Sequence, residues 1–236
     1  MTVAISGASG FVGRYLGKWL LEHEYGVLAL VRSRHATTPP GVEVRQIPEH
    51  PTVSDLQNAF AGATSVVHLA GRAHVMREHT EAPIEAYRVA NVELTRTMLQ
   101  AAVGAGCSTF VLASSVKAVG ERNDTPWNEE SPAAPVDPYG VSKLEAEQLV
   151  VTEGARLGLR TVVLRFPLIY GPGMRANMLR LFHAVDRGIP LPIGAVANRR
   201  SLLFVGNAAA SVGLALDRAD AGSGLYFVSD GQDLST

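Results

Sequence analysis

The sequence predicts an α/β fold in which helices cover both faces of a doubly wound parallel sheet. Two observations lead to this fold class. Short apolar runs alternate with helical patterns along nearly the whole chain, and a glycine-rich turn joins the first run to the first helix. Successive crossovers between parallel strands need helices on both faces of the sheet. With 236 residues, 47% of them hydrophobic, the chain can bury a sizeable core.

Strands and helices are expected in alternation. Apolar runs typical of buried parallel strands lie at residues 2–6, 26–31, 42–47, 65–70, 109–113, 160–166 and 225–229. Helical patterns lie at residues 14–23, 53–60, 80–104, 139–157, 177–187 and 207–218. Residues 199–205 are expected to be extended. The proline-containing segments 121–136 and 167–173 are expected to be loops.

The first strand ends in the glycine-rich turn Gly7-Ala8-Ser9-Gly10-Phe11-Val12-Gly13. Gly7 allows a tight turn, Gly10 lets the backbone approach a pyrophosphate, and Gly13 lets the following helix pack closely on the sheet. The N-terminus of that helix would face the phosphates. The turn therefore indicates a bound dinucleotide, and a purely structural turn is the alternative because glycine triplets alone are weakly specific.

The end of the second strand bears on which dinucleotide is bound. Enzymes that use NAD place an acidic side chain near the 2'-hydroxyl of the adenosine ribose. This chain has Arg32-Ser33-Arg34 there, and a guanidinium would accept a 2'-phosphate. The position favours NADP over NAD, with a solvated loop arginine as the alternative.

Composition and charge exclude several kinds of partner and site. The formal net charge is -1, with both signs spread along the chain, so no nucleic-acid partner is expected. The single Cys107 rules out an internal disulfide and a cysteine-based metal cluster, and a buried thiol is expected. His74, Met76 and His79 have no carboxylate at a metal-ligand spacing, so no metal site is predicted.

The first residues of the chain lead directly into a strand. No basic segment followed by an apolar one precedes this strand, and no run of eighteen apolar residues occurs. We therefore expect neither export nor a membrane span. A reducing cytoplasm is the default location.

Polar residues occur where the predicted sheet would bind a ligand. Ser114 and Ser115 follow the fifth strand, and the carboxyl ends of parallel strands form the ligand crevice. A serine-stabilised turn is the alternative. Gly71 follows the fourth strand, where a cofactor could cross the sheet. Asn91 is a poor choice inside the helix predicted at 80–104, so it is either exposed or a polar group that holds the active site together.

The segment from Asp137 to Lys143 carries the strongest chemical signal. Asp137 is a good N-cap and Pro138 suits the first helical position, so a helix should begin here with Tyr139 in its first turn. Lys143 follows one turn later on the same face. Its ammonium should lower the pKa of Tyr139 towards neutrality, as acid–base catalysis of alcohol oxidation or ketone reduction requires. A surface tyrosine and a solvated lysine are the alternative.

Together these motifs resemble the extended short-chain dehydrogenase/reductases, in the NAD-dependent epimerase/dehydratase branch. The motifs are the three glycines of the first turn, the serine pair before Val119-Gly120, Tyr139-x-x-x-Lys143 and the segment from Arg165 to Gly173. Further similarity to bacterial UDP-glucose 4-epimerase-like proteins of polysaccharide biosynthesis lies in His68-Leu69-Ala70 with His74-Val75-Met76, Ser114 to Lys117 and Arg199 to Leu202.

The resemblance covers nearly the whole chain and implies two regions. Residues 1–170 would form a Rossmann-type dinucleotide-binding domain that includes the catalytic helix. Residues 171–236 would form a partial nucleotide-sugar-binding region, which looks truncated. Val119 stands where the family usually has a tyrosine, and this departure puts one substrate or cofactor contact in doubt.

The resemblance also implies roles for individual residues. Tyr139 would be the acid/base, Lys143 would lower its pKa and bind the nicotinamide ribose, and Ser115 would match the catalytic serine or threonine. Ser115, Asn177 and Arg200 would bind the substrate, the last two by holding the nucleotide diphosphate of a sugar. Contacts to NAD or NADP are expected from Gly7, Gly10, Phe11, Gly13, Arg32, Ala70, Tyr139, Lys143 and Pro167.

The activity implied is NAD(P)-dependent 4-epimerisation of a UDP-linked hexose through a 4-keto intermediate. A reductase of a UDP-4-keto sugar would use the same residues and stays open, as does a non-catalytic nucleotide-binding sensor. A dehydratase is disfavoured because Val116-Lys117 replaces an Asp-Glu pair. The helices at 80–104 and 139–157 resemble those that pair in family homodimers, so a homodimer is expected.

Overall fold

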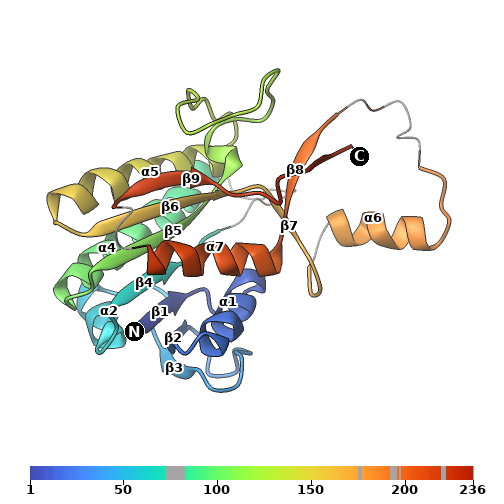
Figure 1. The fold of residues 1–236 in the computed structure, drawn as a ribbon. Helices are drawn as coiled ribbons and strands as arrows, with labels where there is room; N and C mark the ends of the chain where they lie inside the picture. The colour runs from blue at the N-terminus through green and yellow to red at the C-terminus, as the bar shows by residue number, and fades with distance from the viewer. Residues whose placement is uncertain (73–82, 175–176, 192–195, 197, 219–221, 236) are drawn as a thin grey trace.

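The structure is a computed structural model that describes residues 1–72, 83–174, 177–191, 196, 198–218 and 222–235. A seven-stranded sheet with the order β3-β2-β1-β4-β5-β6-β9 forms its body (Figure 1). Every pair of neighbouring strands in it is parallel. The strands are β1 (Thr2–Ser6), β2 (Gly26–Val31), β3 (Glu43–Gln46), β4 (Ser65–His68), β5 (Thr109–Ser115), β6 (Arg160–Phe166) and β9 (Gly224–Phe227). The predicted doubly wound α/β sheet is therefore confirmed.

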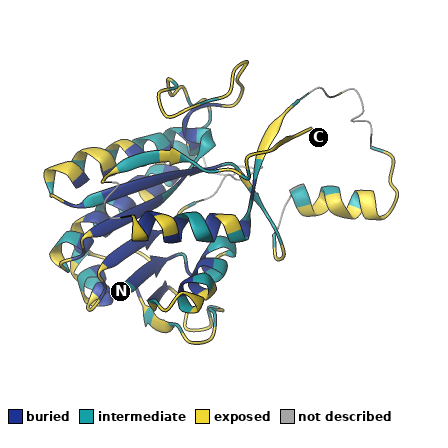
Figure 2. Ribbon diagram, viewed as in Figure 1, coloured by how far each residue is buried: buried dark blue, intermediate teal, exposed yellow. Residues whose placement is uncertain are grey.

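Helices cover both faces of this sheet (Figure 1). One face packs against α1 and α7, and the other packs against α2, α4 and α5. Their bounds are α1 (Phe11–Glu22), α2 (Val53–Phe60), α4 (Leu94–Gly104), α5 (Pro138–Arg156) and α7 (Val205–Asp217). Because both faces are covered, the central strands are buried along their length, which is why they form continuous apolar runs in the sequence (Figure 2).

The helix predicted at 80–104 is irregular in its described part. It consists of α3 (Pro83–Arg88), a π-helical turn η1 (Val89–Glu93) and then α4. A π-helical turn inside an α-helix is frequently found at a functional site. The residue in the middle of this turn is Asn91.

A second, three-stranded sheet lies beside the body. Its strand β7 falls within residues 167–173, where a loop was predicted. Its order is β10-β8-β7, and Leu168 of β7 pairs in parallel with Leu202 of β8. The loop prediction was wrong for Leu168–Tyr170, because the partner strand lies far away in the sequence, whereas residues 171–173 form a turn. The elements of this region are β7 (Leu168–Tyr170), α6 (Asn177–Asp186), β8 (Arg200–Phe204) and β10 (Asp233–Leu234).

The second sheet and α6 are much more exposed than the body (Figure 2). By contrast, α7 and β9 pack within the body although they follow residue 170 in the sequence. The predicted division of the chain at residue 170 stays a prediction. No described helix has both the length and the apolar character needed to cross a membrane.

Candidate active site

A cavity of about 270 Å³ opens at the carboxyl ends of the central strands. It brings together five residues predicted for the site: Ala70 after β4, Ser115 at the end of β5, Tyr139 and Lys143 of α5, and Pro167 after β6. Its other lining residues are Val12, Leu69, Gly71, Arg72, Asn91, Ala113, Ser114, Phe166 and Ile169. Ligands of open α/β sheets bind at this edge, next to the point where the strand order reverses.

The glycine turn after β1 has no room for side chains. Gly7 has φ +72°, and a Cβ there would lie 2.8 Å from the backbone nitrogen of Ala70. A Cβ at Gly13 would lie 2.2 Å from the carbonyl oxygen of Gly7. Gly10 N-caps α1 without a side-chain cap, and the first turn of α1 has no acidic residue. The free N–H groups at this helix start fit the pyrophosphate of a dinucleotide. Phe11 is half-buried at the same helix start.

Ser6 and His68 anchor this turn to the neighbouring strand. The Ser6 hydroxyl is hydrogen-bonded to His68 Nδ1 at 2.6 Å, and its oxygen accepts the N–H of Ala70 at 3.2 Å. Burial, with a smaller contribution from the nearby Lys143 ammonium, lowers the pKa of His68 to about 3, so the imidazole is neutral. The sequence indicated His68 only through the family resemblance.

The residues of the predicted acid–base group meet as expected. Asp137 caps α5, because its Oδ1 accepts the N–H of Gly140 at 2.6 Å and Pro138 occupies the first turn. The predicted helix start is therefore confirmed. Tyr139 and Ser115 share a side-chain hydrogen bond at the wall of the cavity. Lys143 is buried, and its ammonium donates to the carbonyl oxygen of Ala113 at 2.7 Å.

The electrostatics of this group differ from the prediction. Burial raises the pKa of Tyr139 above its ordinary value, and the Ser115 hydrogen bond and the Lys117 charge offset this only in part. Burial lowers the pKa of Lys143 to about 8, and the Glu147 carboxylate opposes that shift. The prediction that Lys143 draws the pKa of Tyr139 towards neutrality was wrong, because desolvation of the phenol dominates and the ammonium is bound to Ala113.

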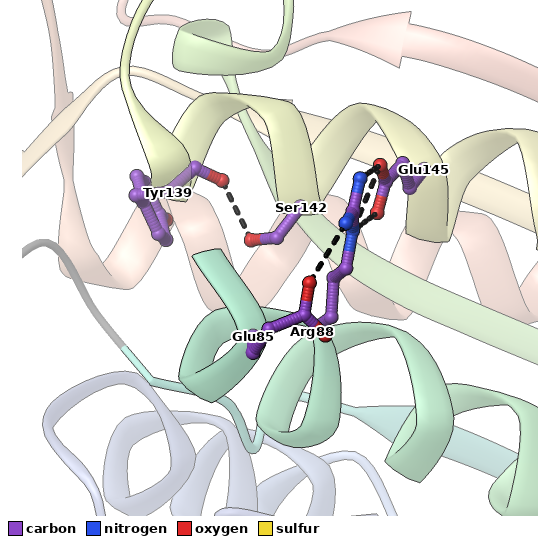
Figure 3. Close-up of polar contacts among 5 residues, drawn as sticks. All are labelled: Glu85, Arg88, Tyr139, Ser142 and Glu145. Carbon is purple, nitrogen blue, oxygen red and sulfur yellow. Dashed lines mark hydrogen bonds and ion pairs between the residues drawn. The ribbon is translucent and has the colours of Figure 1, made fainter. Parts of the chain in front are cut away.

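Asn91 is 2% exposed and joins two parts of the site. Its Oδ1 accepts the N–H of Arg72 at 2.7 Å, and its Nδ2 donates to Ser142 Oγ at 2.9 Å. The Ser142 hydroxyl in turn donates to the carbonyl oxygen of Tyr139 at 2.8 Å (Figure 3). Asn91 was predicted to be either an exposed residue or a polar group that holds the site together. The structure shows the second, because Asn91 is buried and hydrogen-bonded on both sides. A Cβ at Gly71 would lie 2.7 Å from Asn91 Oδ1, so this glycine makes room for Asn91.

Arg88 holds α3 against α5 beside the tyrosine. Figure 3 shows its guanidinium between the carboxylates of Glu85 and Glu145, with distances of 3.0 and 2.7 Å to their nearest oxygens. This pairing places Tyr87 of α3 next to the site, with its ring centroid 6.0 Å from that of Tyr139. Sequence reasoning missed these contacts because they join segments 57 residues apart.

A buried ion pair lies behind the cavity, and sequence reasoning missed it too. Arg165 Nη2 is 2.7 Å from Glu147 Oε2, and both residues are less than 5% exposed. Ser114 donates to the same carboxylate at 2.5 Å. Helical spacing could have indicated Glu147, because it follows Lys143 by one turn on the face of α5 that carries Tyr139.

Seven predicted site residues lie outside the cavity lining: Gly7, Gly10, Phe11 and Gly13 of the turn described above, and Arg32, Asn177 and Arg200. Arg32 is exposed at the end of β2, whereas the neighbouring Arg34 donates to Gln46 Oε1 at 2.8 Å. Arg200 is exposed at the start of β8. Asn177 begins α6, and its side chain is not described.

The histidines and methionine considered for a metal, His74, Met76 and His79, lie outside the described residues. In the described part of the chain, no three or more His, Cys, Asp or Glu side chains are grouped so that they could hold a metal ion. Cys107 is buried, as predicted.

Known proteins share both the sequence and the fold. The sequence model of the NAD dependent epimerase/dehydratase family matches residues 3–228. A UDP-glucose 4-epimerase of Vibrio cholerae is 34% identical over 239 residues, which cover 100% of this chain and 72% of that protein. Among solved structures, MoeE5 in complex with UDP-glucuronic acid and NAD has a TM-score of 0.84 at 30% identity and covers 100% of this chain and 78% of its own.

A UDP-N-acetylglucosamine 4-epimerase from Bacillus cereus also has a TM-score of 0.84, at 28% identity and with the same coverage of the two chains. The match to the family model over nearly the whole sequence and the full-length similarity agree with the glycine turn and with the tyrosine and lysine at the cavity. The chain belongs to the NAD-dependent epimerase/dehydratase family, as the motifs predicted.

Proposed function

We propose that this chain is a nucleotide-sugar 4-epimerase of the UDP-hexose class, with NAD or NADP as its cofactor. One observation carries the proposal: the hydrogen-bonded side chains of Ser115 and Tyr139 line the same cavity as Lys143, at the sheet edge next to the glycine turn. The relatives described above include 4-epimerases of UDP-glucose and UDP-N-acetylglucosamine, and this favours epimerisation over net reduction.

In this proposal Tyr139 moves the proton of the sugar hydroxyl. Its phenolate oxygen accepts the proton of the C4 hydroxyl as C4 becomes a ketone, and its phenol returns that proton when the hydroxyl forms again. Ser115 donates a hydrogen bond to the same substrate oxygen. When bound, the dinucleotide supplies the group that removes hydride from C4 and returns it to the opposite face.

The protein residues that would hold the dinucleotide surround the turn after β1. Gly7, Gly10 and Gly13 leave the space and the free N–H groups for a pyrophosphate. Phe11, Ala70 and Pro167 would line its path, and Lys143 would bind the nicotinamide ribose. Arg32, whose side chain has no hydrogen-bond partner among the described residues, would meet a 2'-phosphate and so favour NADP.

The substrate would reach from the cavity towards the exposed second sheet. Arg200 of β8 and Asn177 of α6 would hold the diphosphate there, within the region predicted at 171–236. A homodimer would form through the face of η1, α4 and α5. That face carries a groove of about 490 Å³ lined by Arg88, Val92, Glu93, Arg96, Glu145, Gln148, Leu149, Thr152 and Glu153.

The test combines identification of the cofactor with a matched variant. Nucleotide released from the purified chain is identified by mass, and C4 epimerisation of UDP-glucose and UDP-N-acetylglucosamine is then followed. Tyr139→Phe should reduce turnover by about 10²- to 10⁴-fold, the usual contribution of a general acid–base, while cofactor affinity stays nearly unchanged. Equal turnover by Tyr139→Phe and the unchanged chain would end the assignment. Stoichiometric consumption of NADPH would instead select the reductase.

A further inference from the structure

The short turn that carries Ser115 is joined to the start of the tyrosine helix by a lysine. Lys117 belongs to the 3₁₀ turn η2 (Val116–Ala118), which directly follows Ser115. Its ammonium is 3.0 Å from Asp137 Oδ2 and also pairs with Glu121. The side chains of Lys117 and Asp137 are 30% and 20% exposed, so water screens this ion pair only in part.

Asp137 makes two contacts with its two carboxylate oxygens. Oδ1 accepts the N–H of Gly140 and so caps α5, while Oδ2 accepts from Lys117. The backbones also touch, because a Cβ at Gly140 would lie 2.4 Å from the carbonyl oxygen of Lys117. On the other side of the turn, Ser115 Oγ accepts the N–H of Lys117 at 3.2 Å. Lys117 therefore contacts both the turn that follows Ser115 and the start of α5, which carries Tyr139.

Charged and titratable groups reach Tyr139 from four elements. From η2 and β5 come Lys117 and Ser115, and from α3 comes Tyr87, whose ring carries the Arg72 guanidinium at 5.2 Å. Asp137 caps α5 and Lys143 lies on that helix, where the Lys143 ammonium is bound to a carbonyl. Arg88, a further cation among the described residues near Tyr139, is held between Glu85 and Glu145.

Two of these charges act on the phenol in opposite directions. After the dominant effect of burial, the Asp137 carboxylate raises the pKa of Tyr139 and the Lys117 ammonium lowers it. Removal of the lysine charge would leave Asp137 and Glu121 without their shared cation. The phenolate would then be harder to form.

We propose that Lys117 is a positioning residue for Tyr139, whose ion pair with Asp137 fixes the Ser115 turn against the start of α5 and keeps a cation near the phenol. The proposal rests on the acid–base role of Tyr139 proposed above. Lys117 does not line the cavity, so it acts on the substrate through Ser115 and Tyr139.

The first experiment measures the ionisation of Tyr139 in the intact chain. The ultraviolet absorbance of phenolate is titrated with pH, and the titration of the matching Tyr139→Phe protein is subtracted. Lys117→Met should raise the pKa of Tyr139 by roughly 0.5 to 1 unit, allowing for solvent screening. Lys117→Arg keeps the charge and should restore the original value. Asp137→Asn, which keeps an N-cap acceptor, should shift the pKa in the opposite direction.

The matched control is Lys18→Met, which makes the same charge change in an exposed pair of α1. The pH profile of turnover on UDP-glucose is the second measurement. Lys117→Met should raise the apparent pKa of its acidic limb by the same amount as the pKa of Tyr139. In a double-mutant cycle, Lys117→Met should have a smaller effect when Asp137 is already Asn.

An unchanged titration in Lys117→Met, or an equal shift in Lys18→Met, would overturn the inference. Should Lys117→Met not fold, the downward shift expected for Asp137→Asn decides, and its absence overturns the inference as well. A chain that shows these shifts but epimerises no nucleotide sugar would refute the proposed function while the electrostatic role of Lys117 stands.

Discussion

The two sheets of this molecule hold their candidate residues in different ways. Ser115, at the end of β5, and Tyr139 and Lys143, on α5, are fixed by buried contacts between strands and helices. Arg200 begins β8, a strand that is exposed at its first two positions. Figure 2 shows the same contrast between the buried body and the exposed second sheet.

The carboxylate of Asp230 joins the second sheet to α7 of the body, in addition to the apolar contacts of Leu203 and Ile169. Asp230 accepts hydrogen bonds from Tyr170 OH at 3.0 Å, from the backbone N–H of Phe204 at 3.0 Å and from Asn207 Nδ2 at 2.8 Å. Burial of Asp230 would raise its pKa, but these bonds outweigh it and the pKa is lowered. Under the proposed function, proton transfer, which needs fixed geometry, would take place at the buried sheet, and the exposed sheet would contribute to substrate recognition.

The largest predicted effect on the buried sheet comes from a substitution in the glycine turn. Gly13→Ala would place a Cβ 2.2 Å from the Gly7 carbonyl oxygen, and backbone there cannot move without shifting β1. Such overpacking should cost about 3 kcal/mol or more, at the upper end of the usual range. We expect a fall of roughly 6–12 °C in the thermal unfolding midpoint and loss of dinucleotide binding, measured by scanning calorimetry and by titration with NAD and NADP.

Gly17→Ala is the matched control in the same helix. The nearest atom to a Cβ at Gly17 is a side-chain carbon of Pro39 at 3.3 Å, so a small adjustment accommodates it. Alanine is also the better helix former, by about 1 kcal/mol. The assignment of Gly13 fails if both alanine variants bind the dinucleotide equally well.

The sequence predicted the elements of the buried sheet well because their patterns are local. The helix at 53–60 and its strand neighbours follow from apolar periodicity, and the Asp137 cap follows from three adjacent residues. It failed for β7, whose partner strand is distant, and for the pKa of Tyr139, because desolvation depends on how many segments cover the ring. The ion pair of Glu147 with Arg165 was missed for the same reason.

Asn91 tests how far the buried contacts preorganise the site. Asn91→Leu removes the acceptor of the Arg72 N–H and the donor to Ser142, and each buried group left unpaired costs about 1–3 kcal/mol. We expect a total loss of about 2–6 kcal/mol of unfolding free energy, measured by urea denaturation. Turnover should fall more than the affinity for the dinucleotide, because Ser142 supports the Tyr139 turn.

Asn58→Leu on α2 is the control for Asn91→Leu, since it makes the same exchange at an exposed position. Its effect on stability should stay within about 0.5 kcal/mol, as for most surface substitutions. An equal loss in the two variants would show that the contacts of Asn91 do not support the site.

The smallest predicted effect on stability comes from Arg200→Ala in the exposed sheet. Arg200→Ala should leave the unfolding free energy within about 0.5 kcal/mol of the original, because the side chain is exposed. If Arg200 holds the diphosphate, the lost charge-assisted hydrogen bond of about 1.5–3 kcal/mol should raise KM for UDP-glucose by roughly 10- to 100-fold. The kcat should stay near its original value, because this contact is equally strong in the ground state and the transition state.

Arg199→Ala, at the neighbouring exposed arginine, is the control for Arg200→Ala. An equal rise in KM there would mean that general positive charge, not Arg200 itself, attracts the nucleotide. A fall in kcat with unchanged KM would instead indicate that Arg200 acts together with the buried acid–base group. It would contradict the proposal that the exposed sheet only binds the substrate.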